Sequence, residues 1–273
     1  MTNTGVLYSI HGRSYWPRLV VSLMTLRRHY QGAVCIMALD DAGYDIAKRL
    51  ADDPATRPID VMRPHIFINC RNGGYAAKPK LPQLSPYTSG VFLDADTVVA
   101  GKFFASLLPK GNEQVVLTQF SNWHTLGKRI DGRVTKWQHV AAEEVHECKL
   151  QSWPAVNTGV YGFVRDSEFF QTAWPTMTLK NSGTFICDEI AAQLLVPRFV
   201  REGKMSILPD WYNCSPVHGA NKEKAVIWHY HGDKHMRPGL PMDTWWPEYL
   251  AARQNNIAGI CDWAVDIDPR LAV

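Results

Sequence analysis

The sequence predicts an α/β fold with a mixed, mainly parallel central sheet flanked by helices. Strand and helix patterns alternate over residues 5–50, as in βαβ units whose strands pair in parallel. Farther along, an apolar segment ends at two carboxylates, Asp94 and Asp96, and the carboxyl ends of strands are where such sheets bind ligands. No internal repeat or linker divides the chain. We therefore expect one domain over residues 1–273, with a C-terminal extension from about residue 236.

The individual elements follow from the spacing of apolar residues and of turn residues. The predicted strands are residues 5–10, 33–39, 59–62, 90–99, 114–120 and 205–208. Residues 153–163 are predicted as a tight turn that leads into a strand, and residues 225–235 as an apolar strand that runs into a histidine-rich turn. The predicted helices are residues 17–29, with Ser14 as the expected cap, and residues 44–50, 166–180 and 184–195. Three prolines make any helix over residues 76–86 short or distorted. Residues 121–151 have no metal-ligand spacing and are interpreted as a variable excursion.

Composition excludes several classes of protein. Of 273 residues, 46% are hydrophobic and 20% are charged, which is ordinary for a globular protein. The net charge of +3 is too small and too scattered to indicate binding to nucleic acid or to a membrane surface, and no segment has the pattern of a leader or a membrane span. The six cysteines are far apart and form no Cys-x-x-Cys pair, so neither a zinc site nor a disulfide framework is indicated. These features predict a soluble, cytoplasmic protein.

The segment Gly90 to Val99 contains the first candidate site. If these residues form one strand, Asp94 and Asp96 point to the same face, because side chains alternate along a strand. Two adjacent carboxylates repel each other unless a cation lies between them, and a divalent metal with oxygen ligands is the natural candidate. A solvated Asp-x-Asp turn at a strand end is the competing interpretation.

Two further polar clusters lie where predicted elements begin or end. Asp188 and Glu189 open a helix, and His229 and His231, with Lys234, follow an apolar strand. Carboxylates combined with imidazole suit Mn²⁺ or Mg²⁺ better than a metal that prefers sulfur, and a lysine adds positive charge for phosphate. Such a set could stabilise a diphosphate leaving group. Each histidine on its own could equally be a hydrogen-bonded residue at a strand end.

Taken together, these segments make the chain resemble a glycosyltransferase of the GT-A fold, family 8, which contains glycogenin and the bacterial lipooligosaccharide galactosyltransferases. The similarity covers roughly residues 5–235, with the motifs in the family's order. The matching segments are Val91-Phe92-Leu93-Asp94-Ala95-Asp96-Thr97, Asn157-Thr158-Gly159, Asp188-Glu189, Leu208-Pro209-Asp210-Trp211-Tyr212-Asn213 and Trp228-His229-Tyr230-His231-Gly232. The resemblance implies a single Rossmann-like domain that transfers a sugar.

The resemblance also implies roles for individual residues on the nucleotide side. Asp94, Asp96 and His229 would bind Mn²⁺ or Mg²⁺. Lys234 would contact the donor diphosphate, and Tyr15 would pack on the uracil of a UDP-sugar. The segment after Gly232 is one residue shorter than in the family and lacks its Pro-Trp pair, which makes the role of Lys234 less secure than that of His229.

Further implied roles lie on the sugar side. Lys78 would face the donor phosphate or sugar, whereas Asn157 and Asp188 would face the donor sugar, with Asp188 nearest the anomeric carbon. Glu189 stands where the family has Gln. Other interpretations stay open from the residues alone: Lys78 as a solvated charge, Tyr15 as an aromatic staple of the first helix, Asn157 as a turn residue and Asp188 as a helix cap.

The sequence thus predicts a metal-dependent, retaining hexosyltransferase that uses a UDP-sugar and an acceptor of unknown class, whether glycan, lipid-linked or protein. A metal-dependent nucleotidyltransferase is the alternative enzyme, although a glycine-rich and basic signature after the first strand is missing. A non-catalytic protein that binds a sugar nucleotide or glycan is the third interpretation. The C-terminal aromatics, including Trp245, Trp246 and Trp263, predict a segment packed near the acceptor side or an interface.

Overall fold

The protein is described by a computed structural model, which covers residues 3–64, 66, 73–120, 132–151, 153–231 and 243–272. Within these residues the strands are β1 (Thr4–Ile10), β2 (Val34–Ala38), β3 (Asp60–Met62), β4 (Ser89–Leu93), β5 (Thr97–Val99), β6 (Val115–Gln119), β7 (Val156–Val164), β8 (Met205–Leu208) and β9 (Ile227–His229). The main helices are α1 (Trp16–His29), α2 (Asp41–Asp52), α3 (Gly73–Ala77), α4 (Leu81–Leu84), α5 (Phe104–Leu107), α7 (Ala142–Leu150), α8 (Trp174–Leu179), α9 (Cys187–Arg201), α10 (Trp245–Gln254) and α11 (Ile260–Ile267).

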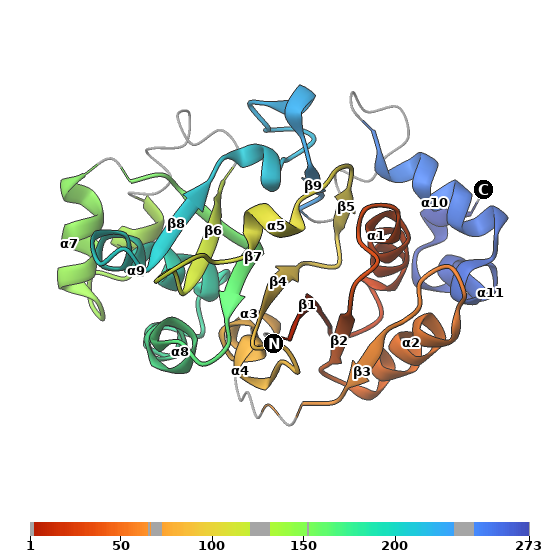
Figure 1. The fold of residues 1–273 in the computed structure, drawn as a ribbon, viewed down its shortest axis with the longest axis horizontal. Coiled ribbons are helices and arrows are strands. Elements are labelled where there is room, and N and C mark those ends of the chain that lie inside the picture. Colours follow the sequence, from red (N-terminus) through yellow and green to blue (C-terminus); the bar gives the residue numbers. More distant parts are fainter. Residues whose placement is uncertain are drawn as a thin grey trace.

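The central sheet has seven strands in the order β3-β2-β1-β4-β7-β6-β8. β1 pairs in parallel with β2 and β4, β2 with β3, and β6 with β8, whereas β7 is antiparallel to both β4 and β6. The predicted mixed, mainly parallel sheet is therefore confirmed. β5 and β9 form a separate two-stranded antiparallel sheet (Figure 1).

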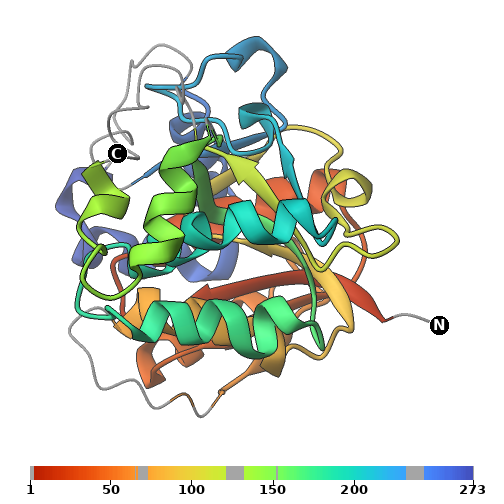
Figure 2. The same ribbon diagram turned by 90° about the vertical axis from the view of Figure 1, so that its left-hand side faces the viewer.

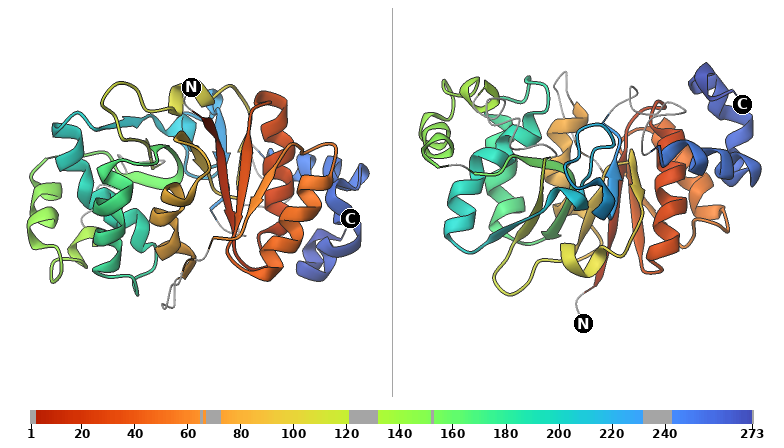
Figure 3. Two further views of the ribbon diagram at one scale, coloured as in Figure 1. Left: turned by 60° about the horizontal axis from the view of Figure 1, so that its bottom comes forward. Right: turned by 90° about the horizontal axis from the view of Figure 1, so that it is seen from above.

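Alternate residues of the strands supply the two faces of the core. Val6 and Tyr8 of β1 belong to the hydrophobic cluster that contains α1, whereas Leu7 belongs to the cluster that contains α9. This division follows from the side-chain period of two in a strand. Helices α1, α2, α10 and α11 lie on one side of the sheet, and α7, α8 and α9 lie on the other (Figures 1 and 2). Seen along other directions, the sheet remains covered on both faces (Figure 3).

Two predicted helix starts differ from the structure. Tyr15, not Ser14, is the residue before α1, and it makes no capping hydrogen bond through its side chain. Pro17 near the start of the helix lacks a backbone donor, so the first turn has less need of a cap. α2 starts three residues earlier than predicted, because the Asp40 carboxylate accepts a hydrogen bond from the Gly43 N–H at 2.7 Å.

Other boundaries differ from the predicted ones or agree with them as follows. The predicted helix over 166–180 contains a π-helical segment, Phe169–Ala173, before α8. α9 continues past Pro197 to Arg201, beyond the predicted end at residue 195. Residues 76–86 form α3, a 3₁₀ turn at Lys78–Lys80, and α4, as the three prolines predict.

The C-terminal segment packs onto α1 and α2. Trp245 and Tyr249 of α10 are fully buried and stacked, and the Trp263 ring meets the edge of Trp16 at a centroid distance of 5.6 Å. These aromatics therefore complete the core on the α1 face. Across the described ranges, no helix combines the length and apolarity needed to cross a membrane. The described cysteines, which are residues 35, 148, 187, 214 and 261, are all free thiols.

Candidate active site

A turn at the end of β4 carries the Asp-x-Asp motif. β4 ends at Leu93, and the Asp94 N–H donates to the Gly159 carbonyl on β7 at 2.7 Å. The Thr97 hydroxyl then donates to the Asp94 carbonyl at 2.8 Å, which closes the turn before β5. The predicted single strand over 90–99 is therefore wrong. The two carboxylates converge because the chain turns between two sheets, not because they alternate along one strand.

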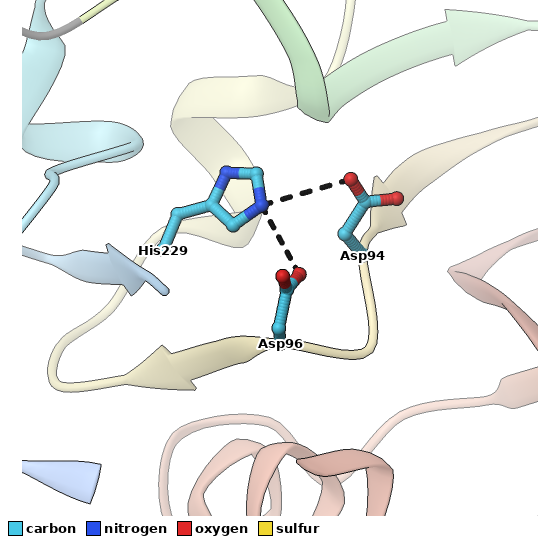
Figure 4. A group of neighbouring side chains, drawn as sticks. All are labelled: Asp94, Asp96 and His229. Carbon is cyan, nitrogen blue, oxygen red and sulfur yellow. Dashed lines mark hydrogen bonds and ion pairs between the residues drawn. The ribbon is translucent and has the colours of Figure 1, made fainter. Parts of the chain in front are cut away.

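His229 reaches the same place through the small second sheet. β9 pairs with β5 so that His229 lies opposite Thr97. Its Nε2 is 3.1 Å from Asp96 Oδ1 and 3.7 Å from Asp94 Oδ2 (Figure 4). One ligand atom from each of the three residues lies within 4.8 Å of the others. The structure thus brings His229 to two aspartates that lie more than a hundred positions earlier in the sequence.

Hydrogen bonds fix which nitrogen of His229 carries the proton. His229 Nδ1 lies 2.7 Å from Asn213 Oδ1, and the Asn213 Nδ2 group donates to Thr118 Oγ1 and to Asn157 Oδ1. Thr118 must accept there, because its own hydroxyl proton goes to the Val160 carbonyl at 2.9 Å. Asn213 Oδ1 is left to accept from His229 Nδ1–H. In the neutral ring the lone pair of Nε2 then faces the two carboxylates.

The electrostatics of this group favour a bound cation. Burial lowers the pKa of His229, but the neighbouring Asp96 and Asp94 raise it more, so the net shift is upward. Burial raises the pKa of Asp94, and this effect exceeds the lowering by Lys78. Asp96 is also buried, but His229 lowers its pKa overall. A buried and a half-buried carboxylate with one buried imidazole are a donor set that fits a divalent cation such as Mn²⁺ or Mg²⁺.

Lys78 links Asp188 to the three residues Asp94, Asp96 and His229 (the metal group). Its Nζ lies 2.9 and 3.0 Å from the two carboxylate oxygens of Asp94 and 3.6 Å from Asp188 Oδ2. Burial lowers the pKa of Lys78, but Asp94 and Asp188 raise it more, so the side chain stays charged. Lys78 is 8% exposed, which excludes the interpretation as a solvated surface charge.

Asp188 presents one oxygen without a hydrogen-bond partner. It lies in the first turn of α9 and is 1% exposed. Its Oδ2 accepts from the Thr158 hydroxyl at 2.7 Å, whereas its Oδ1 has no partner within the described part of the chain. The residue before α9 is Ile186, in a left-handed conformation with φ of 54°, so Asp188 is not the helix cap. A buried carboxylate oxygen with no donor is suited to accept a ligand hydroxyl.

Asn157 lies between Glu189, the residue after Asp188, and the metal group. Its Nδ2 donates to Glu189 Oε2 at 2.5 Å, and its Oδ1 accepts from the Gly159 N–H at 2.8 Å. Glu189 Oε1 forms an ion pair with Arg133. Burial raises the pKa of Glu189, and Arg133 opposes this rise. Asn157 is therefore a buried link in a polar network and more than a turn residue.

Gly159 permits the close approach of β7 to the metal group. A Cβ at this position would lie 2.0 Å from His229 Cε1 and 2.8 Å from Asp94 Oδ2. Real Cβ atoms do not come so close to other heavy atoms, so only glycine fits without displacing the two side chains.

Tyr15 and Lys234 are the two remaining predicted site residues. Tyr15 lies in the loop after β1, half-buried, with the Arg18 guanidinium 4.5 Å from its ring centroid. Arg18, in the first turn of α1, helps to lower the pKa of Asp96, so this end of α1 is within electrostatic range of Asp96. Lys234 lies outside the described residues. His231 lies beside the metal group, with its ring centroid 3.9 Å from that of His229.

Sequence reasoning missed three contributors to the site. Arg133 lies in the segment interpreted as an excursion, and no local pattern pairs it with Glu189. Thr158 and Asn213 occur inside motifs used for the resemblance, but only the folded network gives them partners.

Comparison with known proteins agrees with this geometry. No protein-family model and no curated protein matches the sequence. Among solved structures, the galactosyltransferase LgtC, in complex with donor and acceptor sugar analogues, matches with a TM-score of 0.58 and 13% identity over 93% of this chain and 95% of that chain. The chain has the GT-A fold. The resemblance found in the sequence is thereby confirmed at the level of the fold.

Two further structures extend the comparison. The bifunctional glycosyltransferase WbbM, in its apo form, matches with a TM-score of 0.64 and 14% identity over 98% of this chain. This chain spans 52% of the WbbM structure. Mouse xyloside xylosyltransferase 1, also in its apo form, matches with a TM-score of 0.53 and 12% identity over 85% of this chain and 98% of that chain.

Proposed function

We propose that this chain is a metal-dependent, retaining glycosyltransferase that moves a hexose from a UDP-sugar to an acceptor. One observation carries the proposal: at the end of the central strand β4, Asp94, Asp96 and His229 converge, with Nε2 of His229 turned toward the carboxylates. The fold and the names of its structural neighbours support glycosyl transfer. Mn²⁺ is the proposed metal, with Mg²⁺ as the substitute.

The metal triplet defines the proposed diphosphate side of the site. A divalent cation held by these residues would supply positive charge that stabilises the departing diphosphate. Asp94 is the most exposed of the three, with 24% of its side chain accessible against 8% for Asp96 and 4% for His229. The donor phosphates are therefore expected to approach from the Asp94 side. Tyr15 borders the same end of the sheet and is the proposed platform for the base, and Lys234 remains a proposed phosphate ligand.

Lys78, Asp188 and Asn157 define the proposed sugar side. Lys78 lies between the Asp94 and Asp188 carboxylates, so it keeps two negative groups close together near the sugar. The unpartnered Asp188 Oδ1 is the proposed acceptor for a sugar hydroxyl. In the reaction the bond between the anomeric carbon and the phosphate oxygen breaks, and its electron pair goes to that oxygen. The acceptor oxygen forms the new bond, and its proton passes to the departing phosphate.

Retention of configuration limits which carboxylate could take part covalently. A double displacement needs a nucleophile near the anomeric carbon. Both oxygens of Glu189 already receive donors, from Arg133 and Asn157, whereas one oxygen of Asp188 has no partner among the residues that the structure describes. Asp188 is therefore the proposed nucleophile if that route is used. If instead the acceptor attacks the anomeric carbon on the same face from which the diphosphate departs, no nucleophilic residue is needed.

The free thiols favour a reducing compartment, and we propose the cytoplasm as the location. The acceptor belongs to one of three classes, namely a glycan, a lipid-linked sugar or a protein.

The test is UDP release from a panel of UDP-sugars, without acceptor, in Mn²⁺, Mg²⁺ or EDTA. We expect slow, metal-dependent release from one sugar, lost in Asp96→Asn and in His229→Ala. A matched control is Glu168→Gln, which removes a carboxylate from a surface ion pair with Arg198 and should leave release unchanged. Absence of release and of metal-dependent UDP binding would refute the proposal. Nucleoside triphosphates and glycans would then test the nucleotidyltransferase and binding-protein alternatives.

A further inference from the structure

Phe185 is an aromatic side chain that the core leaves uncovered. It is 65% exposed, and no other aromatic residue in the described part of the chain is exposed to a similar extent. The next residue, Ile186, packs against the hydrophobic cluster that contains α9, although its φ of 54° is rare for a β-branched residue. The chain therefore keeps a strained turn that covers Ile186 and leaves the Phe185 ring outside. Single exposed rings are common on protein surfaces, so the position of this one decides what it can do.

Phe185 and Tyr75 meet beside the proposed sugar side of the site. Their rings are nearly perpendicular, with an interplanar angle of 82° and centroids 5.4 Å apart. Tyr75 lies three residues before Lys78, and Phe185 lies three residues before Asp188. The ring contact thus joins the same two segments as the ion pair between Lys78 and Asp188, at 3.6 Å. Because Asp188 is 1% exposed, Lys78 8%, Tyr75 half-buried and Phe185 65%, the rings lie on the solvent side of this ion pair.

The phenol of Tyr75 is within electrostatic range of the whole site. Burial raises its pKa to about 12, Tyr15, Asp188 and Asp94 raise it further, and Lys78 opposes the rise. At neutral pH the hydroxyl therefore keeps its proton. It can donate a hydrogen bond to an oxygen atom of a bound molecule.

An exposed aromatic face next to a hydroxyl donor matches the chemistry of a sugar ring. A pyranose carries C–H groups on its two faces and hydroxyl groups around its rim. The negative face of an aromatic ring attracts the weakly positive C–H groups, and covering apolar area adds to the attraction. Phe185 can therefore hold one face of a pyranose while the Tyr75 hydroxyl reaches its rim. A serine or threonine side chain has no such face.

We propose that Phe185 and Tyr75 form the acceptor subsite and that the acceptor presents a pyranose ring there, as a glycan or a lipid-linked sugar does. The inference rests on the proposed hexose transfer, because the acceptor hydroxyl must come within about 3–3.5 Å of the anomeric carbon that Asp188 is proposed to face. The donor sugar occupies the inner position beside Lys78 and Asp188. The outer, exposed ring is left for the acceptor.

The first experiment is acceptor-dependent UDP release, with the UDP-sugar found in the release panel. The acceptors are methyl glycosides of glucose, galactose, mannose and N-acetylglucosamine. We expect Phe185→Ala to raise the KM for the best glycoside about tenfold, which corresponds to about 1.4 kcal/mol, and by more than it raises the KM for the UDP-sugar. Phe185→Tyr keeps the ring and should restore the KM, whereas Phe185→Leu should not. Leu179→Ala is the matched control, because Leu179 is 58% exposed at the end of α8, and it should leave the KM unchanged.

Three kinetic results would overturn the inference. The first is an equal KM for the glycoside in the wild type and in Phe185→Ala. The second is a larger effect on the KM for the UDP-sugar, which would assign the ring to the donor. The third is release stimulated by a serine- and threonine-containing peptide and by none of the glycosides. The octyl glycoside of the best sugar distinguishes the two sources: a lower KM than for the methyl glycoside indicates a lipid-linked sugar and an equal KM indicates a glycan, and both results support a pyranose at Phe185.

The second experiment needs neither metal nor donor. Saturation-transfer difference NMR of the same methyl glycosides should show C–H protons of one pyranose face against wild-type protein and against Phe185→Tyr, with weaker signals for Phe185→Ala. Identical spectra for the wild type and Phe185→Ala, or no glycoside signal with the wild type, would overturn the inference. If the wild type releases UDP from no UDP-sugar, the proposed function fails, and the NMR comparison still decides whether these two rings hold a sugar.

Discussion

Replacing Gly159 by alanine tests the closest packing at the candidate site. The new Cβ would lie 2.0 Å from His229 Cε1, 2.7 Å from His229 Nδ1 and 2.8 Å from Asp94 Oδ2. Ordinary contacts between carbon atoms are about 3.5–4.0 Å, so the histidine ring must move by roughly 1.5 Å or more. Metal sites tolerate errors of only about 0.2 Å in ligand distance. The substitution should therefore misplace at least one proposed ligand.

We expect Gly159→Ala to lower Mn²⁺ affinity by about 10- to 100-fold. We also expect it to lower the free energy of unfolding by about 1–3 kcal/mol, the usual cost of overpacking a core. Mn²⁺ titration and urea denaturation measure the two effects. Gly101→Ala is the matched control, because its Cβ would meet nothing closer than Val226 Cγ1 at 3.5 Å. A folded Gly159→Ala protein with wild-type Mn²⁺ affinity would refute the proposed ligand geometry.

Two further predictions concern groups away from the site. The hydrogen bond from Lys204 lowers the pKa of Glu168 below 4.5. The ionised Glu168 carboxylate therefore stabilises the fold above about pH 4.5, and this stabilisation is lost as the pH falls through the lowered pKa. Glu168→Gln should therefore lower the free energy of unfolding by about 0.2–1 kcal/mol at pH 7 and leave it unchanged in acid. Equal losses at the two pH values in urea denaturation would contradict this prediction. Burial raises the pKa of each of Cys35, Cys148 and Cys214 to about 12, so these thiols should react with an aromatic disulfide reagent only after denaturation. Mass spectrometry that finds them modified as fast in native protein would contradict their burial.

The central sheet could be predicted because its strands have a recognisable sequence pattern. β1, β2 and β6 are short apolar runs with turn residues on either side, and such runs form strands wherever both faces are covered. The convergence of Asp94, Asp96 and His229 was also predictable, because Asp94 and His229 lie at the ends of apolar runs and Asp96 is two residues from Asp94. Their role as metal ligands remains a prediction. The roles of Lys78, Asn157 and Asp188 remain predictions, although the structure places all three beside the triplet.

The break in the predicted strand over 90–99 could not be read from the sequence. Thr97, Val98 and Val99 continue the apolar pattern of β4, yet they pair with β9 instead of with the central sheet. Which partner a strand chooses depends on residues more than a hundred positions away. The same limit applies to Glu189, whose partner Arg133 lies 56 residues earlier and shares no local pattern with it.

The pairing of β5 with β9 has a consequence for the order in which the protein matures. His229 follows Asp96 by 133 residues. At synthesis rates of about 5–20 residues per second, the third proposed ligand emerges roughly 7–27 seconds after the second. Lys78 is made before both aspartates and can neutralise Asp94 during that interval. A nascent chain can therefore build its first strands and helices without capturing a metal, and the proposed ability to bind one would arise only after His229 is made.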